Sequence, residues 1–421
     1  MSLSTQPYKG ARDFYPEDKR IQKYMFGKLR QIVESFGYQE YDAPIIELFD
    51  IYTAKSGEEL VNDQLYSFVD RGDRKVAIRP EMTPTVSRMV AGRRQELAYP
   101  LRWYSIPNLW RYERPQKGRL REHWQLNVDI FGVEGKEADQ EIIQIADSVL
   151  KSFGATGDMY EIKVNSRAAM KELLEKAGYN GDIIPKIIGA FDRLGKTSFQ
   201  PYLNENFDEN DKTKLEEFVD KTSGDDILAT NSGANLSTVI QRLKAAGIDV
   251  KPDVSINRGF DYYTDIVFEV FDKDPENNRS LFGGGRYDGL VAEFGVEAVP
   301  TVGFGMGDVT LQNFLESHNL LPKLKPETDA TIILVGDVYE NVQNALAELR
   351  QKGIKVAVDS SGRKLDAQIK NAVKSGVRYA IFIGEQELES STFKLRDLEK
   401  GEEKNLNLEE IASTLLAARP E

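Results

Sequence analysis

A short segment rich in proline and lysine, residues 322–326, divides the chain into two regions with different hydrophobic patterns. The 421 residues are too many for one hydrophobic core and predict two or three domains. After this segment, apolar strands alternate with helical patterns, which is typical of a small parallel or mixed α/β domain. Before it, strand and helix patterns mix in an α+β arrangement. We therefore predict one domain over residues 1–325 and a second over 326–421.

Hydrophobic periodicity also predicts individual elements within these regions. Residues 168–252 are dominated by helical spacing and are interpreted as a helical insertion between two halves of the first domain. A helix over 16–36 should end at Gly37, and Pro44 suggests an edge position in a strand over 38–47. The other predicted elements are strands at 75–78, 102–106, 125–132, 266–268, 331–335, 355–358 and 379–383, and helices at 139–153, 339–352 and 365–375.

Composition excludes several kinds of chemistry. The chain has no cysteine, which rules out disulfides, thiolate nucleophiles and cysteine-ligated zinc, and its only histidines are His123 and His318. Any catalysis should therefore depend on carboxylates, guanidinium groups and a bound cation. No apolar run reaches the roughly eighteen residues needed to span a bilayer, and the first residues lack a secretory signal, so we expect a cytoplasmic protein with no membrane association. A net charge of −13 argues against broad, non-specific nucleic-acid binding.

Residues 258–264 combine Arg258, Asp261 and the adjacent phenols Tyr262 and Tyr263. A guanidinium can hold a phosphate or carboxylate through two parallel hydrogen bonds, and phenols with an acid suit a pocket for a small polar ligand. The apolar strand that follows at 266–268 indicates that the cluster lies at the edge of a sheet. Aromatic residues also favour strands for packing alone, so this segment by itself leaves both interpretations open.

Residues 111–125 place four arginines and a lysine around a Pro/Gly turn between strand-like flanks. Alternation predicts Arg111 and Glu113 on one face before the turn, and Arg119, Arg121, His123 and Gln125 on one face after it. Clustered inward arginines are costly unless an anion neutralises them, which favours a triphosphate-binding hairpin over a solvated tip.

Two further segments contribute weaker signals. Residues 79–85 mark the end of a strand and the start of a helix, where Glu81 and Thr83 could serve either a ligand or simple helix capping. The three glycines at 283–285 allow a backbone to approach a ligand closely and to adopt positive φ, and a second run has glycines at 303, 305 and 307. The G-x-G-x-G spacing of the second run lacks the strand-turn-helix context of a dinucleotide site, so we reject that interpretation.

In this order, the segments resemble the histidyl-tRNA synthetases, which are class II aminoacyl-tRNA synthetases, over essentially the whole chain. The segments that carry the resemblance are 10–13, the strand around Pro44, 79–83, 111–125, 258–264, 283–290 and the C-terminal region. The resemblance implies an antiparallel class II catalytic sheet with flanking helices, an α/β anticodon-binding domain and a homodimer. It also implies a ligase that activates histidine with ATP and magnesium and transfers it to tRNA(His) for protein synthesis.

The resemblance implies roles for individual residues. Arg111 and Arg258 would act on the α-phosphate, with Arg119 beside the reacting carboxylate and phosphates. The residues implied in ATP binding are Arg111, Glu113, Arg119, Arg121, His123 and Gly305. Those implied in histidine binding are Glu81, Thr83, Arg119, Gln125, Asp129, Arg258, Tyr262 and Tyr263, with Tyr263 and Asp129 reading the imidazole. No protein-derived metal site is implied, and magnesium would accompany the ATP phosphates.

Three positions depart from the family pattern. The family usually has glutamate at the position of Asp129, and phenylalanine stacking on adenine at the position of His123. It also has arginine on the γ-phosphate at the position of Thr310. We hypothesise that Arg286 or Arg121 supplies the missing charge. The principal alternative is a catalytically inactive paralogue that binds histidine as a regulatory subunit of ATP phosphoribosyltransferase. A class II ligase for glycine, proline or threonine is a second alternative.

Overall fold

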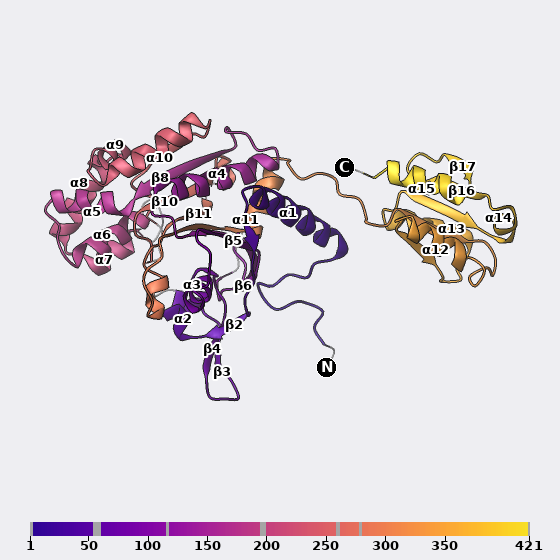
Figure 1. The fold of residues 1–421 in the computed structure, drawn as a ribbon, viewed down its shortest axis with the longest axis horizontal. Coiled ribbons are helices and arrows are strands. Elements are labelled where there is room, and N and C mark those ends of the chain that lie inside the picture. The colour runs from indigo at the N-terminus through magenta and orange to yellow at the C-terminus, as the bar shows by residue number, and fades with distance from the viewer. Residues whose placement is uncertain are drawn as a thin grey trace. The chain divides into compact units, whose positions relative to one another are not determined.

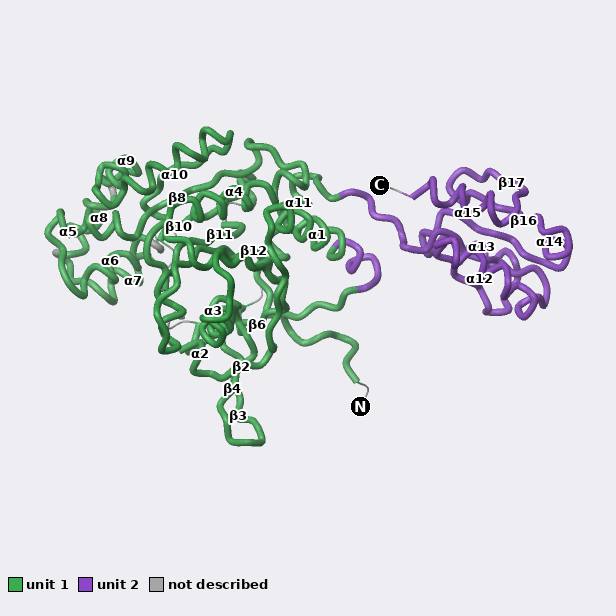
Figure 2. Tube along the Cα trace, viewed as in Figure 1, with its two compact units in different colours: residues 1–14, 22–321 green, residues 15–21, 322–421 purple. Residues whose placement is uncertain are grey.

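The structure is a computed structural model that describes residues 3–53, 60–114, 118–193, 199–257, 262–277 and 280–419. The chain separates into two compact units, shown in Figure 2. One consists of Met1–Phe14 and Gln22–Leu321, and the other of Tyr15–Ile21 and Pro322–Glu421. None of the helices in these described ranges is long and apolar enough to cross a membrane.

A nine-stranded sheet forms the centre of the first unit (Figure 1). Its strand order is β1-β5-β7-β12-β11-β10-β8-β9, and β6 pairs with β7. All pairs are antiparallel except β1 with β5 and β8 with β9, so the predicted α+β class and the antiparallel sheet are confirmed. The strands are β1 (Gln39–Glu40), β5 (Leu101–Ser105), β6 (Asn108–Trp110), β7 (Glu122–Phe131), β8 (Tyr160–Ser166), β9 (Val250–Pro252), β10 (Ile266–Asp272), β11 (Ser280–Arg286) and β12 (Thr301–Gly307).

Helices pack against this sheet through regular apolar faces. Helix α4 (Lys136–Ser152) buries Ile142, Ile145 and Val149 at helical spacing, and α11 (Asp308–Ser317) follows β12 directly. Helix α1 (Pro16–Ser35) ends before Gly37, whose φ of 84° continues no right-handed helix, as predicted. The segment between β8 and β9 is helical: α5 (Arg167–Lys176), α6 (Ile183–Asp192), α7 (Phe199–Asn206), α8 (Glu209–Lys221), α9 (Gly224–Leu228) and α10 (Gly233–Ala245).

A small three-stranded sheet, β2-β4-β3, lies beside α3 and α2. The single strand predicted over residues 38–47 is wrong, because the chain forms β1 and then a separate β2 (Ile46–Leu48) after Pro44. Proline lacks the N–H that a continuous ladder would need there. The remaining elements of this region are α2 (Asp50–Thr53), a π-helical turn (Leu60–Gln64), β3 (Ser67–Val69), β4 (Lys75–Ile78), α3 (Thr83–Gly92) and two 3-10 turns (Pro275–Asn277 and Val291–Phe294).

The C-terminal part of the chain forms a mixed five-stranded sheet of order β14-β13-β15-β16-β17. The first three strands are parallel and the last two antiparallel, as the strand-helix alternation predicts. Ile332, Ile381 and Leu346 belong to its buried core. The elements are β13 (Ala330–Leu334), α12 (Gln343–Gln351), β14 (Val356–Asp359), α13 (Leu365–Lys374), β15 (Tyr379–Ile383), α14 (Glu385–Ser390), β16 (Phe393–Asp397), β17 (Glu403–Leu406) and α15 (Leu408–Ala417).

Candidate active site

A polar pocket lies over the glycine-rich middle of the central sheet. It is lined by residues of β7, β11 and β12, the turn before α3 and the first residue of that helix, and the segments that follow β6 and β11 and precede β10. The lining residues are Glu81, Thr83, Arg111, Gln125, Asn127, Asp129, Tyr262, Tyr263, Gly283, Tyr287, Gly303, Phe304 and Gly305. The structure therefore brings together eight of the predicted site residues, namely Glu81, Thr83, Arg111, Gln125, Asp129, Tyr262, Tyr263 and Gly305.

Strand β7 supplies one wall of the pocket through its alternation. Gln125, Asn127 and Asp129 all line the pocket because every second side chain of a strand points to the same face. His123, two residues before Gln125, is expected on the same face of the strand. The predicted shared face of residues 119–125 is thus correct only for its last part, because β7 begins at Glu122.

Two glycines of β12 make room for the β7 side chains. Gly303 pairs with Asp129, and a Cβ on it would lie 2.1 Å from Asp129 Oδ1 and 2.7 Å from the carbonyl oxygen of Val128. A Cβ on Gly305 would lie 2.9 Å from the Gln125 side chain. The three glycines at 283–285 are ordinary residues of β11 without positive φ, so the conformational role predicted for them is wrong. The glycines of β12 instead allow the side chains of β7 to lie close to the β12 backbone.

Asp129 is the buried acid of the pocket. Burial raises its pKa to about 7, although a hydrogen bond donated by the Tyr287 hydroxyl lowers the pKa in part. Burial and the nearby Asp129 carboxylate in turn raise the pKa of Tyr287 well above its usual value, so Tyr287 keeps its proton. A carboxyl that titrates near neutrality can accept a hydrogen bond from a ring N–H or pair with a cationic ring.

Three tyrosines pack next to this acid. The ring centroids of Tyr262 and Tyr263 are 4.8 Å apart, and those of Tyr262 and Tyr287 are 5.6 Å apart. Tyr262 and Tyr263 are 6% and 8% exposed, so both the packing and the ligand interpretations of this segment apply to them. Arg258, Gly259, Phe260 and Asp261 lie outside the described residues.

The turn between β4 and α3 brings a second acid into the pocket. Glu81 is buried and accepts a hydrogen bond of 3.3 Å from the Tyr262 hydroxyl. The capping interpretation of this turn is wrong, because the N-cap residue of α3 is Met82, which makes no side-chain capping bond. The Pro80 carbonyl accepts a 2.9 Å hydrogen bond from Arg111 Nε and so orients that guanidinium in the pocket.

The hairpin between β6 and β7 carries the other predicted cations. Arg119 is largely exposed and lies 3.8 Å from Glu113. The Arg121 guanidinium is buried and contacts the Glu113 carbonyl, the Tyr8 hydroxyl and the Tyr112 ring. Neither arginine lines the pocket. Burial, together with the positive charges of Arg111 and Arg12, lowers the pKa of His123 to about 3, so this imidazole is neutral at physiological pH.

Arg286 cannot supply the charge missing at Thr310, so that part of the hypothesis is wrong. All five N–H groups of its guanidinium are engaged, with Asp139, Asp288 and the carbonyls of Val133 and Gly135. Thr310 itself donates to the carbonyls of Leu281 and Gly307.

Three pocket residues, Asn127, Tyr287 and Phe304, were assigned no role from the sequence, and the run that contains Gly283 was predicted only to allow close approach of the backbone. Asn127 follows from alternation once Gln125 and Asp129 are placed on one face of a strand. The roles of Tyr287 and Gly303 next to Asp129 could not be found in this way, because they depend on the register that puts β12 beside Asp129. No local pattern in the sequence encodes that register.

Family profiles match both parts of the chain. The profile of the family described as "Histidyl-tRNA synthetase" matches residues 10–309. The chain belongs to this family. A profile described as "Anticodon binding domain" matches residues 329–418 of the same chain.

Relatives cover nearly the full length of this family member. A histidine–tRNA ligase from Leptospira biflexa is 42% identical in an alignment of 409 positions that covers 94% of each chain. A histidine–tRNA ligase from Thermoplasma volcanium is 39% identical and covers 98% of this chain and 99% of its own. The crystal structure of apo S. aureus histidyl-tRNA synthetase has a TM-score of 0.76 at 26% identity and covers 98% of this chain and all of its own.

Replacing Gly303 by alanine tests the close approach of β12 to Asp129. We expect Gly303→Ala to lower the free energy of unfolding by about 1–3 kcal/mol, because the new methyl group overlaps both Asp129 and the Val128 backbone. Urea denaturation measures this change. Gly27→Ala is the control, because Gly27 is in helix α1 with nothing within 4 Å of an added Cβ. Equal stability of Gly303→Ala and wild type would contradict the packing described.

The raised pKa of Asp129 predicts a specific pH dependence of stability. Its pKa is about 7 in the folded chain against a usual 3.8, so ionisation destabilises the fold increasingly as pH rises between these two values. Asp129→Asn should therefore gain stability relative to wild type from about pH 4 to pH 7 and show a constant difference above that. Thermal unfolding across this range measures the difference, with exposed Asp249→Asn as a control for the loss of one carboxylate. A difference that does not change with pH would show that Asp129 is not a buried, titrating acid.

Proposed function

We propose that this chain is a ligase that activates histidine with ATP and transfers the histidyl group to tRNA(His). The observation that carries the proposal is the buried, tyrosine-bonded Asp129 in the polar pocket of a histidyl-tRNA synthetase family member. The relatives that match over more than nine-tenths of the chain are named histidine–tRNA ligases. We place the reaction in the cytoplasm, where protein synthesis consumes charged tRNA.

The pocket offers complementary groups for both ends of histidine. In our proposal, Glu81, Thr83 and Gln125 bind the α-amino group, because a buried carboxylate and two acceptor side chains suit an ammonium ion. Asp129 and Tyr263 read the imidazole at the opposite side. Amino acids without a ring N–H would give Asp129 no donor beyond the Tyr287 hydroxyl, which disfavours their binding. The aspartate has a shorter side chain than the family's usual glutamate. Because Asp129 pairs with Gly303, its carboxylate lies close to the backbone of β12.

ATP binding is assigned to the hairpin and the neighbouring strand. Arg111, fixed by the Pro80 carbonyl, is placed to hold the α-phosphate. Neutral His123 can stack on adenine without adding charge. Gly305 leaves room beside the Gln125 side chain. Glu113, Arg119 and Arg121 complete the proposed ATP site. Arg121 remains our candidate for the charge absent at Thr310, since its described contacts are a carbonyl, a hydroxyl and a ring.

Magnesium is expected to arrive with ATP. Within the described ranges, no cluster of three or more histidine or acidic side chains could hold a metal ion by itself. Magnesium commonly binds through substrate phosphates with few protein ligands, so we derive no catalytic step from a metal site of the protein.

The proposed reaction needs positioning and charge stabilisation and no protein nucleophile. A carboxylate oxygen of histidine forms a bond to the α-phosphorus as the bond from that phosphorus to the pyrophosphate oxygen breaks. A hydroxyl of the terminal adenosine of tRNA then attacks the carbonyl of the mixed anhydride, and AMP leaves. Arg111 and Arg258 stabilise the charge at the α-phosphate in the first step, with Arg119 beside the carboxylate.

A homodimer is the assembly we propose. Ile46 and Leu48 of β2 and Phe68 and Val69 of β3 are large apolar side chains left 43–64% exposed together with their neighbour Ile45. Several large exposed apolar side chains on one small sheet are typical of a surface that another protein covers. These residues follow the strand around Pro44 that resembles the dimer-interface motif of class II synthetases.

The catalytically inactive paralogue is not favoured. The chain carries a match to the anticodon-binding domain at 329–418 in addition to the synthetase match at 10–309. A regulatory subunit that only senses histidine would have no use for an anticodon-binding domain.

Amino-acid-dependent exchange of pyrophosphate into ATP tests the function. We expect histidine to drive exchange, and glycine, proline and threonine to give only background, because they cannot satisfy Asp129. Transfer of labelled histidine to tRNA, measured with the same protein, tests the second step. Histidine binding without any exchange would instead support the inactive paralogue, and exchange driven by one of the other three amino acids would contradict the assignment.

A further inference from the structure

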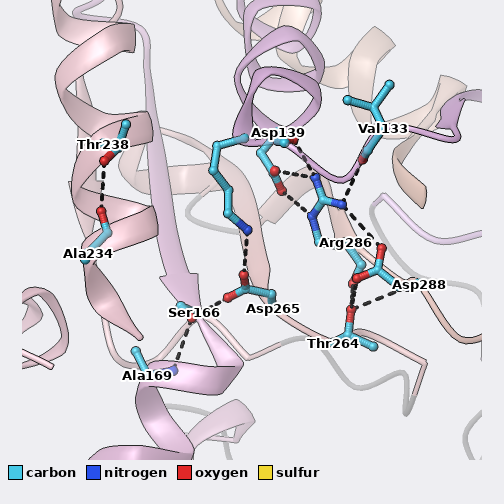
Figure 3. A network of polar contacts seen from close by, with 12 residues as sticks. Val133, Asp139, Ser166, Ala169, Ala234, Thr238, Thr264, Asp265, Arg286 and Asp288 are labelled. Atoms are coloured by element: carbon cyan, nitrogen blue, oxygen red, sulfur yellow. Dashed lines mark hydrogen bonds and ion pairs between the residues drawn. The ribbon is translucent and has the colours of Figure 1, made fainter. Parts of the chain in front are cut away.

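The segment that carries Tyr262 and Tyr263 is held in place by a polar network that starts in the first turn of helix α4 (Figure 3). Two residues of that turn, Lys136 and Asp139, are three positions apart and so lie on one side of the helix. Each begins a separate chain of contacts. Both chains end on Thr264 or Asp265, directly after the two tyrosines.

The first chain runs through Arg286. The Arg286 guanidinium donates hydrogen bonds of 2.6 and 3.2 Å to Asp139 and also contacts Asp288 at 3.3 Å. Asp288 accepts a 3.2 Å hydrogen bond from the Thr264 hydroxyl, and the Thr264 N–H donates to the Arg286 carbonyl at 2.8 Å. Figure 3 shows Thr264 directly below Asp288 and Arg286.

The second chain runs through Asp265. One carboxylate oxygen of Asp265 lies 3.0 Å from Lys136 Nζ, and the other accepts a 2.7 Å hydrogen bond from the Ser166 hydroxyl. Ser166 is also the N-cap of helix α5, where it accepts from the Ala169 N–H. The next residue, Arg167, donates to the carbonyl of Tyr263 at 2.9 Å.

The two chains differ in burial, which determines how each can be tested. The side chains of Arg286 and Asp139 are 3% and 1% exposed, and removing either would leave an uncompensated buried charge that threatens the whole fold. The Lys136–Asp265 pair is 20% and 16% exposed, so it can be broken without burying a lone charge completely. The Thr264 hydroxyl is a neutral group in the other chain.

We propose that Lys136 and Asp139 are positioning residues for amino-acid selection, acting through Asp265 and Arg286 to fix the tyrosine segment against the pocket. This inference rests on the proposed function, because it assigns Tyr263 to the imidazole. Neither Lys136 nor Asp139 lines the pocket, so their effect on the substrate is transmitted by the backbone of residues 262–265. Because that segment faces histidine, loosening it should weaken histidine binding and leave ATP binding unchanged.

The experiment compares Lys136→Met with a matched control, Lys163→Met. Lys163 also makes a 3.0 Å ion pair, with Asp253, and its 26% exposure is close to that of Lys136. Lys163 also lies 3.7 Å from Glu161, so Lys163→Met should lose at least as much stability as Lys136→Met. We expect only Lys136→Met to raise KM for histidine, by about three- to tenfold, with KM for ATP unchanged in both. Lys136→Arg should have a KM for histidine close to that of wild type, because arginine keeps the positive charge.

Thr264→Val provides a second, isosteric probe in the other chain and should produce the same selective rise in KM for histidine. Calorimetric titration of histidine into wild type separates a failure of the proposed function from a failure of the positioning role. Wild type that neither binds histidine nor supports exchange would overturn the proposed function and this inference with it. Active wild type, with Lys136→Met and Thr264→Val both indistinguishable from Lys163→Met in KM for histidine, would overturn the positioning role alone. A parallel rise in both KM values would also overturn it, since that is the result of general loosening.

Discussion

The burial of Asp129 against the backbone of β12 is the constraint on which the rest of the site depends. A carboxyl in that position is tolerated only because Gly303 has no side chain and because Tyr287 donates to it. Its pKa of about 7 records the cost of that burial. A group kept near its titration point in a polar pocket is suited to meet another group that titrates in the same range, and imidazole is such a group.

The elements around Asp129 follow from this requirement. The register of β7 and β12 places Gly303 opposite Asp129, and Tyr287 directly follows the last residue of β11. The tyrosine segment must then be held at a fixed distance from the acid. The first turn of α4 does this through one buried and one partly exposed ion pair. We propose that the hairpin before β7 provides cations for phosphate, with Arg111 oriented by the Pro80 carbonyl. Helix α5 begins on the same network, so the helical region between β8 and β9 is connected to the pocket.

Local patterns in the sequence were enough to predict much of the fold and part of the site. Helix α1, its end at Gly37, the three parallel strands of the C-terminal sheet and the face of β7 with Gln125 and Asp129 depend on periodicity and turn chemistry, which are local. The antiparallel strands β16 and β17 were not predicted. Tyr287 and the engagement of Arg286 depend on contacts between residues more than a hundred positions apart, which no window of sequence contains. For the same reason the glycines at 283–285 were assigned a conformational role that they do not have.

A crystal structure of this chain with histidine bound tests the central claim most directly. The account predicts an imidazole nitrogen within about 3 Å of an Asp129 carboxylate oxygen, with the α-amino group at Glu81 and Gln125. Histidine bound in the reverse orientation, with its ammonium group on Asp129, would contradict the account, as would an imidazole that contacts neither Asp129 nor Tyr263.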